Sequence, residues 1–286
     1  MPSRFSPSDR LAFEADGYLL VKGLFDSDEI NLLRTAIETD PAIASHFYER
    51  FDAMGKPTRM VTWNEPGDSV YGLAARSERV VDTMEDILGG EVYHYHSKLT
   101  AKEPYEGGAW EWHQDYGYWY HNGCLFPDMA SVMIALDPST RANGCLQVLR
   151  GSHRLGRLDH GLLDGQQVGA DLARVAHAEK RLELVYAEMA PGDGLFFHCN
   201  TLHRSAQNQS AERRWTVICC YNSAANDPYQ EHHHPCYTPL EKVADSAIMQ
   251  AGLRFADAGF DSAFLGQATA PAELTRPIGK QFSSEP

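Results

Sequence analysis

The sequence predicts a mainly β core of the sandwich or barrel type with flanking helices. Short β-type runs follow one another between about residues 91 and 222. Strong turn signals separate these runs, among them Asn143-Gly144 and the Pro-Gly-Asp-Gly sequence at 191–194. The stretches on either side carry helical patterns instead. We therefore expect one domain whose β core is covered by helices on one face.

Helical signals dominate the first third of the chain. Ser6 is typical of an N-cap, and Pro7 follows it at the first helical position, which predicts a short helix through Ala15. Gly17 is typical of a helix end. The apolar run at 18–21 then predicts a short strand.

Two further helices are predicted in this third. Asp26 and Glu29, three residues apart, form a capping box. The apolar positions that follow fall on one helical face and are Ile30, Leu33, Ala36 and Ile37. The pattern from about 78 to 88 predicts the next helix, which Gly89-Gly90 ends.

The predicted β core consists of six runs, at 92–102, 131–136, 145–149, 182–188, 195–198 and 215–221. Helical character returns at about 239–251, and the polar stretch at about 269–286 is expected to be loosely ordered. We therefore treat 1–286 as a single domain. It has a helical N-terminal part (about 1–90), a β core (about 91–222) and a helical, loosely ordered C-terminal part (about 223–286).

Composition and charge narrow the class of protein. The 286 residues include 25 Lys and Arg against 39 Asp and Glu, a formal charge of −14. This balance argues against a nucleic-acid binder and against a polybasic membrane-surface role. No apolar run of membrane-spanning length and no signal-peptide pattern is found, so we expect a cytoplasmic protein without nucleic-acid or membrane partners. The six cysteines form no C-x-x-C pair and are expected to be reduced thiols.

Histidine, with 13 residues, is the one count that could indicate metal chemistry. His113 and Asp115 lie two positions apart, so on a strand both side chains would point to one face. An imidazole beside a carboxylate offers two ligands for a divalent metal. A third ligand would complete a facial triad with open positions. The pair alone is a weak signal, since about one such pair is expected by chance.

A second segment offers the third ligand and a cation. His203 can supply the ligand, although His198 is an alternative. Arg214 lies 11 residues after His203, and two antiparallel strands joined by a turn would bring both to one face. A guanidinium suits bidentate binding of a carboxylate, to which Ser205 could add a hydroxyl. Arg214 could equally be a structural ion-pair residue.

Together these residues resemble the phytanoyl-CoA dioxygenase family of iron(II)- and 2-oxoglutarate-dependent oxygenases. The resemblance covers about residues 10–225, and four pieces match in order: His113-Gln114-Asp115, Arg141 to Gly144 with Gly151 to His153, Gly192-Asp193 with Phe196 to His198, and His203 to Ser205 with Arg214. It implies a double-stranded β-helix, a cupin-like jelly roll of two sheets. It also implies hydroxylation of an unactivated C–H bond of a small-molecule metabolite with O₂, releasing succinate and CO₂.

Carried over residue by residue, the resemblance assigns iron binding to His113, Asp115 and His203. It selects His203 over His198 because the family ligand lies 11 residues before the arginine. Arg214 and Ser205 would hold the distal carboxylate of 2-oxoglutarate.

The same resemblance points to a pocket for cosubstrate and substrate. His96 stands where relatives such as ectoine hydroxylase have Gln, and Met133 stands where some relatives place an aromatic residue beside the cosubstrate. The candidates are His96 and Met133 for the cosubstrate, and Lys98, Lys102, Trp119 and Tyr116 for the substrate. Because the chain is acidic, a small organic acid or amino-acid derivative is favoured over a CoA thioester.

Two other functions stay open at the level of the residues. One is a non-catalytic jelly-roll binding module, against which the intact triad and Arg214 argue. The other is a metal-dependent hydrolase that uses the same ligands with an activated water, which leaves Arg214 and Ser205 without a role.

The three histidines at 232–234 are interpreted as a loop near the site or a surface feature, because neighbours in an extended segment point to alternate faces. The sequence does not indicate an oligomeric state.

Overall fold

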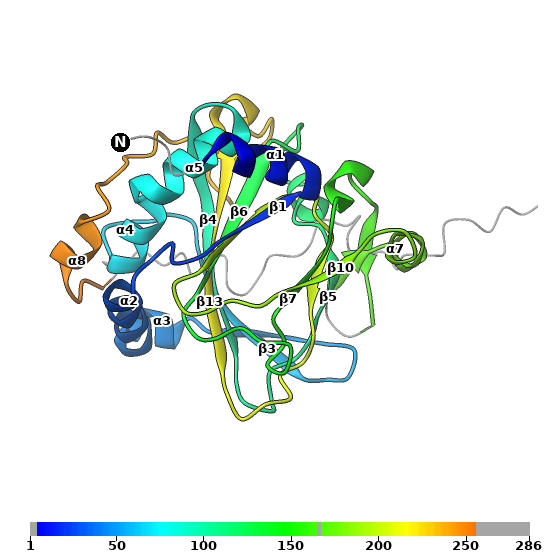
Figure 1. Cartoon of the computed structure of the whole chain (residues 1–286), viewed down its shortest axis with the longest axis horizontal. Coiled ribbons are helices and arrows are strands. Elements are labelled where there is room, and N and C mark those ends of the chain that lie inside the picture. Colours follow the sequence, from blue (N-terminus) through cyan, green and yellow to red (C-terminus); the bar gives the residue numbers. More distant parts are fainter. Residues whose placement is uncertain (1–4, 165–166, 256–286) are drawn as a thin grey trace, which may run out of the picture.

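Two antiparallel β-sheets pack face to face in the computed structural model, which describes residues 5–164 and 167–255 (Figure 1). The larger sheet has the order β1-β11-β6-β13-β4-β3-β2. Its strands are β1 (Tyr18–Val21), β2 (Tyr48–Phe51), β3 (Pro57–Trp63), β4 (Val92–Lys102), β6 (Met129–Ala135), β11 (Gly194–His198) and β13 (Arg214–Ser223).

The smaller sheet has the order β10-β7-β12-β5. Its strands are β5 (Trp110–His113), β7 (Leu146–Leu149), β10 (Leu184–Ala187) and β12 (His203–Ser205). A separate pair consists of β8 (His160–Leu162) and β9 (Val168–Ala170). This arrangement confirms the predicted mainly β, jelly-roll fold, although the sheets do not join into a closed barrel in the described residues.

Helices cover the outer face of the larger sheet, as predicted (Figure 1). They are α1 (Pro7–Asp16), α2 (Ser27–Thr39), α3 (Pro41–Ser45), α4 (Val70–Arg76), α5 (Glu78–Leu88) and α8 (Ala247–Ala251). Of these, α5 packs directly on β4, β6 and β13. The smaller sheet carries α6 (Tyr116–Trp119) and α7 (Leu172–Glu179), and two 3-10 turns lie at Ser152–Leu155 and Ala224–Asn226. No helix in the described segments is both long and apolar enough to cross a membrane.

The predicted caps explain where the first helices begin. The Ser6 hydroxyl accepts a hydrogen bond from the Asp9 amide at 3.2 Å, and Pro7 opens α1. The Asp26 carboxylate accepts from the Glu29 amide at 2.9 Å, and Glu29 accepts in return from the Asp26 amide. Gly17 ends α1 with a left-handed φ of 79°. The sequence therefore predicted α1, α2 and α5; α1 ends at Asp16, one residue beyond the predicted Ala15, and no end was predicted for α2.

The N-terminal and C-terminal parts differ from the prediction. The N-terminal part also forms β2 and β3, which extend the larger sheet beyond β4, where the sequence analysis expected only helices and β1. The helix expected at 239–251 is confined to α8, because Val243 instead exchanges backbone hydrogen bonds with Arg76 and Glu78. The stretch at 269–286 lies outside the described residues.

Buried apolar side chains of the described residues form three clusters, of which the two larger ones form layers. One lies between the helices and the larger sheet and includes Phe25, Leu33, Val80 and Phe196. The other lies between the two sheets and includes Tyr95, Trp119, Met133 and Leu195. The second layer is the interior into which the candidate site residues point.

A buried ion pair fastens α2 to α5 in the outer layer. The Arg79 guanidinium donates to both carboxylate oxygens of Glu29, at 2.7 and 2.8 Å, and also to the Leu24 carbonyl. Both charged side chains are buried. Arg79 also lies 3.0 Å from the Asp245 carboxylate, which is 26% exposed. Because a single buried charge is far more costly than a buried pair, Glu29 depends on Arg79, and Arg79 depends on both carboxylates.

Replacing Glu29 with Ala should therefore lower the free energy of unfolding by about 3–5 kcal/mol, since it leaves Arg79 buried without this partner and removes half of the capping box. Urea unfolding of Glu29→Ala tests this expectation. The exposed neighbour Asp28, changed to Ala, is the control and should cost less than about 1 kcal/mol. Equal losses in the two variants would contradict the importance of the pair.

Candidate functional site

Three metal-binding side chains converge at one point between the sheets. His113 is the last residue of β5, His203 is the first residue of β12, and Asp115 directly precedes α6. His113 and His203 are opposite each other in the β5–β12 pair, with ring centroids 4.0 Å apart. One ligand atom of each of the three residues lies within 4.8 Å of the other two, and all three side chains are buried. The fold thus brings together the triad named from the sequence.

Asp115 reaches this point by a different route from the one predicted. Because β5 ends at His113, the two residues do not share a strand face. Asp115 has helical dihedral angles (φ −57°, ψ −38°) and stands at the N-terminus of α6. Its carbonyl accepts from the amides of Tyr118 and Trp119. The prediction of a continuous strand was wrong, and the turn from strand to helix brings the carboxylate beside the imidazoles.

The two histidines are held in the form that binds metals. Nδ1 of His113 donates to the Glu111 carbonyl at 2.7 Å, and Nδ1 of His203 donates to the Thr201 carbonyl at 2.9 Å. A carbonyl oxygen only accepts, so each Nδ1 carries the proton and each Nε2 presents a lone pair. Burial lowers the pKa of both rings, and for His113 the neighbouring His203 lowers the pKa further. Two neutral imidazoles and a carboxylate fit a divalent first-row metal ion.

Polar groups of the larger sheet surround Asp115. The Ser131 hydroxyl of β6 donates to Oδ2 at 3.2 Å, and Nζ of Lys98 in β4 lies 3.7 Å from Oδ1. Burial opposes the charged form of Lys98, but the carboxylate outweighs it and raises the pKa of Lys98. Lys98, whose role the sequence left open, thus lies beside the metal-binding cluster. The Trp110 indole N–H also donates to Nε2 of His113 at 3.1 Å.

Arg214 lies across the interior on the larger sheet. It is the first residue of β13 and is 2% exposed. Its Nε and Nη1 atoms are buried without a hydrogen-bond partner among the described residues. Burial lowers its pKa to about 10, so the guanidinium stays charged at neutral pH. A buried cation with unused donors needs an anion, and the described chain provides none within ion-pair distance.

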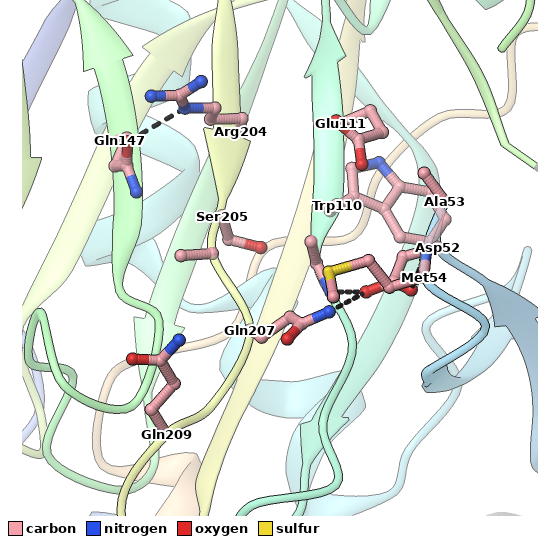
Figure 2. A pocket seen from close by; sticks show the side chains of 12 residues that line it. Asp52, Ala53, Met54, Trp110, Glu111, Gln147, Arg204, Ser205, Gln207 and Gln209 are labelled. Carbon is pink, nitrogen blue, oxygen red and sulfur yellow. Dashed lines mark hydrogen bonds between the residues drawn. The ribbon is translucent and has the colours of Figure 1, made fainter. Parts of the chain in front are cut away.

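Ser205 is a buried residue of β12 in the smaller sheet, whereas Arg214 belongs to the larger sheet. The expected hairpin between the strands of His203 and Arg214 is not present, because β12 and β13 belong to different sheets. Ser205 also lines a pocket of about 290 Å³ between β12 and β5, together with Trp110, Glu111, Asp52 and Ala206, among others. Figure 2 shows the Ser205 hydroxyl directed toward β5, across the gap of this pocket.

The remaining predicted residues are distributed over the interior. Lys102 lies four residues beyond Lys98 on β4, about 13 Å along the strand, and stands opposite Arg214. Met133 is buried on β6 between Leu195 and Ile218. The Tyr116 hydroxyl donates to the carbonyls of Cys124 and Leu125, so its polar end is used within the chain.

A group of aromatic rings surrounds the predicted pocket residue His96. His234 stacks on His96 with centroids 4.4 Å apart and an interplanar angle of 14°. Tyr95 lies 4.5 Å from His234, and Trp119 lies 5.8 Å from His96. The run at 232–234 was predicted to be a loop near the site or a surface feature, and the contact between His234 and His96 agrees with the first of these. The run of three histidines is the signal, but sequence could not indicate which one turns inward.

The sequence matches a known enzyme family and is similar to two known enzymes. The family model described as phytanoyl-CoA dioxygenase matches residues 13–216. L-proline trans-4-hydroxylase of Streptomyces griseoviridis is 33% identical over 196 residues, which cover 63% of this chain and 71% of that protein. Ectoine dioxygenase of Streptomyces avermitilis is 28% identical over 254 residues, which cover 83% and 85% of the two proteins.

Solved structures agree with these relatives. The chain is similar to EctD from S. alaskensis with 2-oxoglutarate and 5-hydroxyectoine, with a TM-score of 0.68 and 25% identity over 85% of this chain and 86% of EctD. The 2-oxoglutarate-dependent carbocyclase SnoK from nogalamycin biosynthesis has a TM-score of 0.64 and 19% identity, covering 82% of this chain and 97% of SnoK. The second similarity concerns the fold alone.

Removing one member of the triad should abolish metal binding. We expect His113→Ala, loaded anaerobically with Fe(II) and desalted, to retain less than about one tenth of the iron bound by the unchanged protein, because two ligands cannot replace three. Elemental analysis measures the metal content. The matched control is His177→Ala, since His177 is exposed on α7. Full iron retention in His113→Ala would remove this residue from the site.

Proposed function

The chain belongs to the phytanoyl-CoA dioxygenase family, and from this premise we propose that His113, Asp115 and His203 hold its iron. The protein is an iron(II)- and 2-oxoglutarate-dependent dioxygenase that hydroxylates a C–H bond of a small molecule. Bound iron and 2-oxoglutarate supply the oxidising power that places one oxygen atom of O₂ on the substrate carbon, with release of succinate and CO₂. The donor set and its protonation support the proposed ligands.

The cosubstrate pocket is proposed from one observation above all, the buried Arg214 guanidinium without a partner among the described residues. We assign the distal carboxylate of 2-oxoglutarate to Arg214 and Ser205, because a carboxylate there would use the free donors and neutralise the charge. A hydrolase or a binding module that used only the metal cluster would leave this cation without a function. The carboxylate anchor therefore favours the oxygenase over both alternatives.

The substrate is proposed to be a small molecule with a negatively charged group. Lys98 is the cation nearest the cluster, and its present ion-pair partner is Asp115. When Asp115 serves as a metal ligand, its charge is shared, and the Lys98 ammonium can face a second anion. Trp119 and His96 offer flat, largely apolar surfaces beside it. This combination suits an organic acid or an amino-acid derivative.

The domain organisation and the location of the enzyme are also proposals. We propose that residues 1–286 act as a single domain, which the shared larger sheet supports because it takes strands from both the N-terminal part and the core. We also propose a cytoplasmic location, which six free cysteines support, five of them buried.

The assignment of the cosubstrate predicts a spectroscopic signature. Anaerobic addition of Fe(II) and 2-oxoglutarate should produce the weak visible charge-transfer band of the chelate. Arg214→Ala should raise the 2-oxoglutarate concentration for half-formation of this band by about 30-fold or more, equivalent to about 2 kcal/mol. Arg213→Ala is the matched control, because the Arg213 side chain instead pairs with Asp137 and Glu38. Absence of the band in the unchanged protein would refute the proposed function.

The charge on the substrate is tested by a paired screen. Small carboxylic acids should stimulate succinate release more than their neutral amides do, and Lys98→Met should remove most of this preference because it deletes the cation. Stimulated succinate release is measured for each pair of compounds. Since Lys98 contacts Asp115, the iron content of Lys98→Met is measured in parallel. Equal stimulation by acids and amides would show that no anionic group is recognised.

A further inference from the structure

A second buried cation lies beside Arg214 and has no role in the mechanism described so far. Lys102 is the last residue of β4 and stands directly opposite Arg214 in the β4–β13 pair. Both side chains are almost fully buried, with 1% and 2% exposure. Residues opposite each other in an antiparallel pair have Cβ atoms about 5 Å apart and project to the same face. Two positive side chains therefore share one interior space.

Lys102 reaches from the larger sheet to the smaller one. Its ammonium donates to the carbonyl of Ala206, the residue that follows Ser205. Ser205 and Ala206 both line the pocket between β12 and β5 (Figure 2). Lys102 thus stands opposite Arg214 and contacts the residue next to Ser205, while Lys98 lies at the candidate metal-binding cluster. This placement separates Lys102 from the substrate role that the sequence suggested for both lysines.

The charges around Lys102 do not balance it. In the described residues no carboxylate lies within ion-pair distance of Lys102 or of Arg214, although Asp52 and Glu111 act on Lys102 from farther away. Cys145 is also close, but burial raises its pKa to about 11 and keeps the thiol neutral. Asp52 is already engaged by the amides of Ala109 and Lys56 and by the Gln207 side chain. In the described residues no carboxylate therefore balances Arg214, or Lys102 when it is protonated.

We infer that Lys102 is a second cationic anchor for the distal carboxylate of 2-oxoglutarate, beside Arg214 and Ser205. This inference rests on the proposed function, because it places another residue in the same cosubstrate pocket. One carboxylate has two oxygens and about four acceptor positions, enough for a guanidinium, a hydroxyl and an ammonium together. A bound carboxylate would thereby balance the Arg214 guanidinium and favour the protonated form of Lys102.

Proton uptake follows from the same arrangement. Burial, followed by the neighbouring charge of Arg214, holds the pKa of Lys102 well below its ordinary value. A bound carboxylate favours the charged ammonium and raises that pKa again. Between the lowered and the restored pKa, 2-oxoglutarate binding takes up a proton, so the affinity falls as the pH rises through this range. The groups that face Lys102 are Arg214 from β13, Cys145 next to β7, Glu111 from β5 and Asp52 after β2.

Two substitutions test whether Lys102 binds the carboxylate, as an anchor, or only supports the fold, as a structural strut. Lys102→Met removes both the charge and the hydrogen bond to Ala206, whereas Lys102→Gln retains a donor without the charge. The control is Lys56→Met, because the Lys56 ammonium also donates to a backbone carbonyl, that of Tyr105, but at the exposed surface. Titration of each anaerobic Fe(II)-loaded protein with 2-oxoglutarate measures the dissociation constant. We expect about 10-fold weaker binding in both Lys102 variants and no change in Lys56→Met.

Calorimetry gives a readout that a strut would not change. In buffers of different ionisation enthalpy, the unchanged Fe(II)-loaded protein should take up protons on binding 2-oxoglutarate, and both Lys102 variants should take up fewer. The ligand-free variants should melt no lower than the unchanged protein, because each removes a buried amine that has no carboxylate partner in the described residues. A lower melting temperature with unchanged affinity and proton uptake would establish a strut and overturn the inference. If the unchanged protein itself binds no 2-oxoglutarate, the proposed function fails instead.

Discussion

The candidate site depends on the short pairing of β5 with β12. This pair puts His113 opposite His203 and fixes the distance between the two imidazoles. The register shifts between His203 and Ser205, the next paired residue is Trp110, and Ser205 and Trp110 both line the pocket of Figure 2. One local irregularity therefore lies between the cluster proposed for the metal and the pocket that Ser205 lines.

Charge burial is the second constraint on this interior. The larger sheet supplies Lys98, Lys102 and Arg214, all directed between the sheets, while the cluster contributes the single carboxylate of Asp115. In a chain with a formal charge of −14, these cations are a local exception. In the layer between the helices and the larger sheet, the buried Arg79 is instead paired with the buried Glu29. An interior that keeps cations unpaired is costly to fold unless it is built to receive anions.

The sequence predicted the local features well and the connections between distant strands poorly. Caps and helix ends follow from near neighbours, so α1, α2 and α5 could be located from Ser6, Asp26 and Gly89. Sheet pairing joins segments that are far apart, and the expected hairpin between the strands of His203 and Arg214 was wrong for that reason. Asp115 was placed on a strand because a two-residue spacing does not reveal a turn into a helix.

The sequence by itself determined the family and, with it, the residues proposed for the site. The types and order of His113, Asp115, His203, Ser205 and Arg214 sufficed to indicate the family, and they carry the donors that a metal ion and a carboxylate need. Only the tertiary structure decided which other residues join them. It separated Lys98 from Lys102 and turned His234 inward against His96. The physical reason is that burial and the distance between charges arise from the packing of two sheets, and neither can be read from positions along one chain.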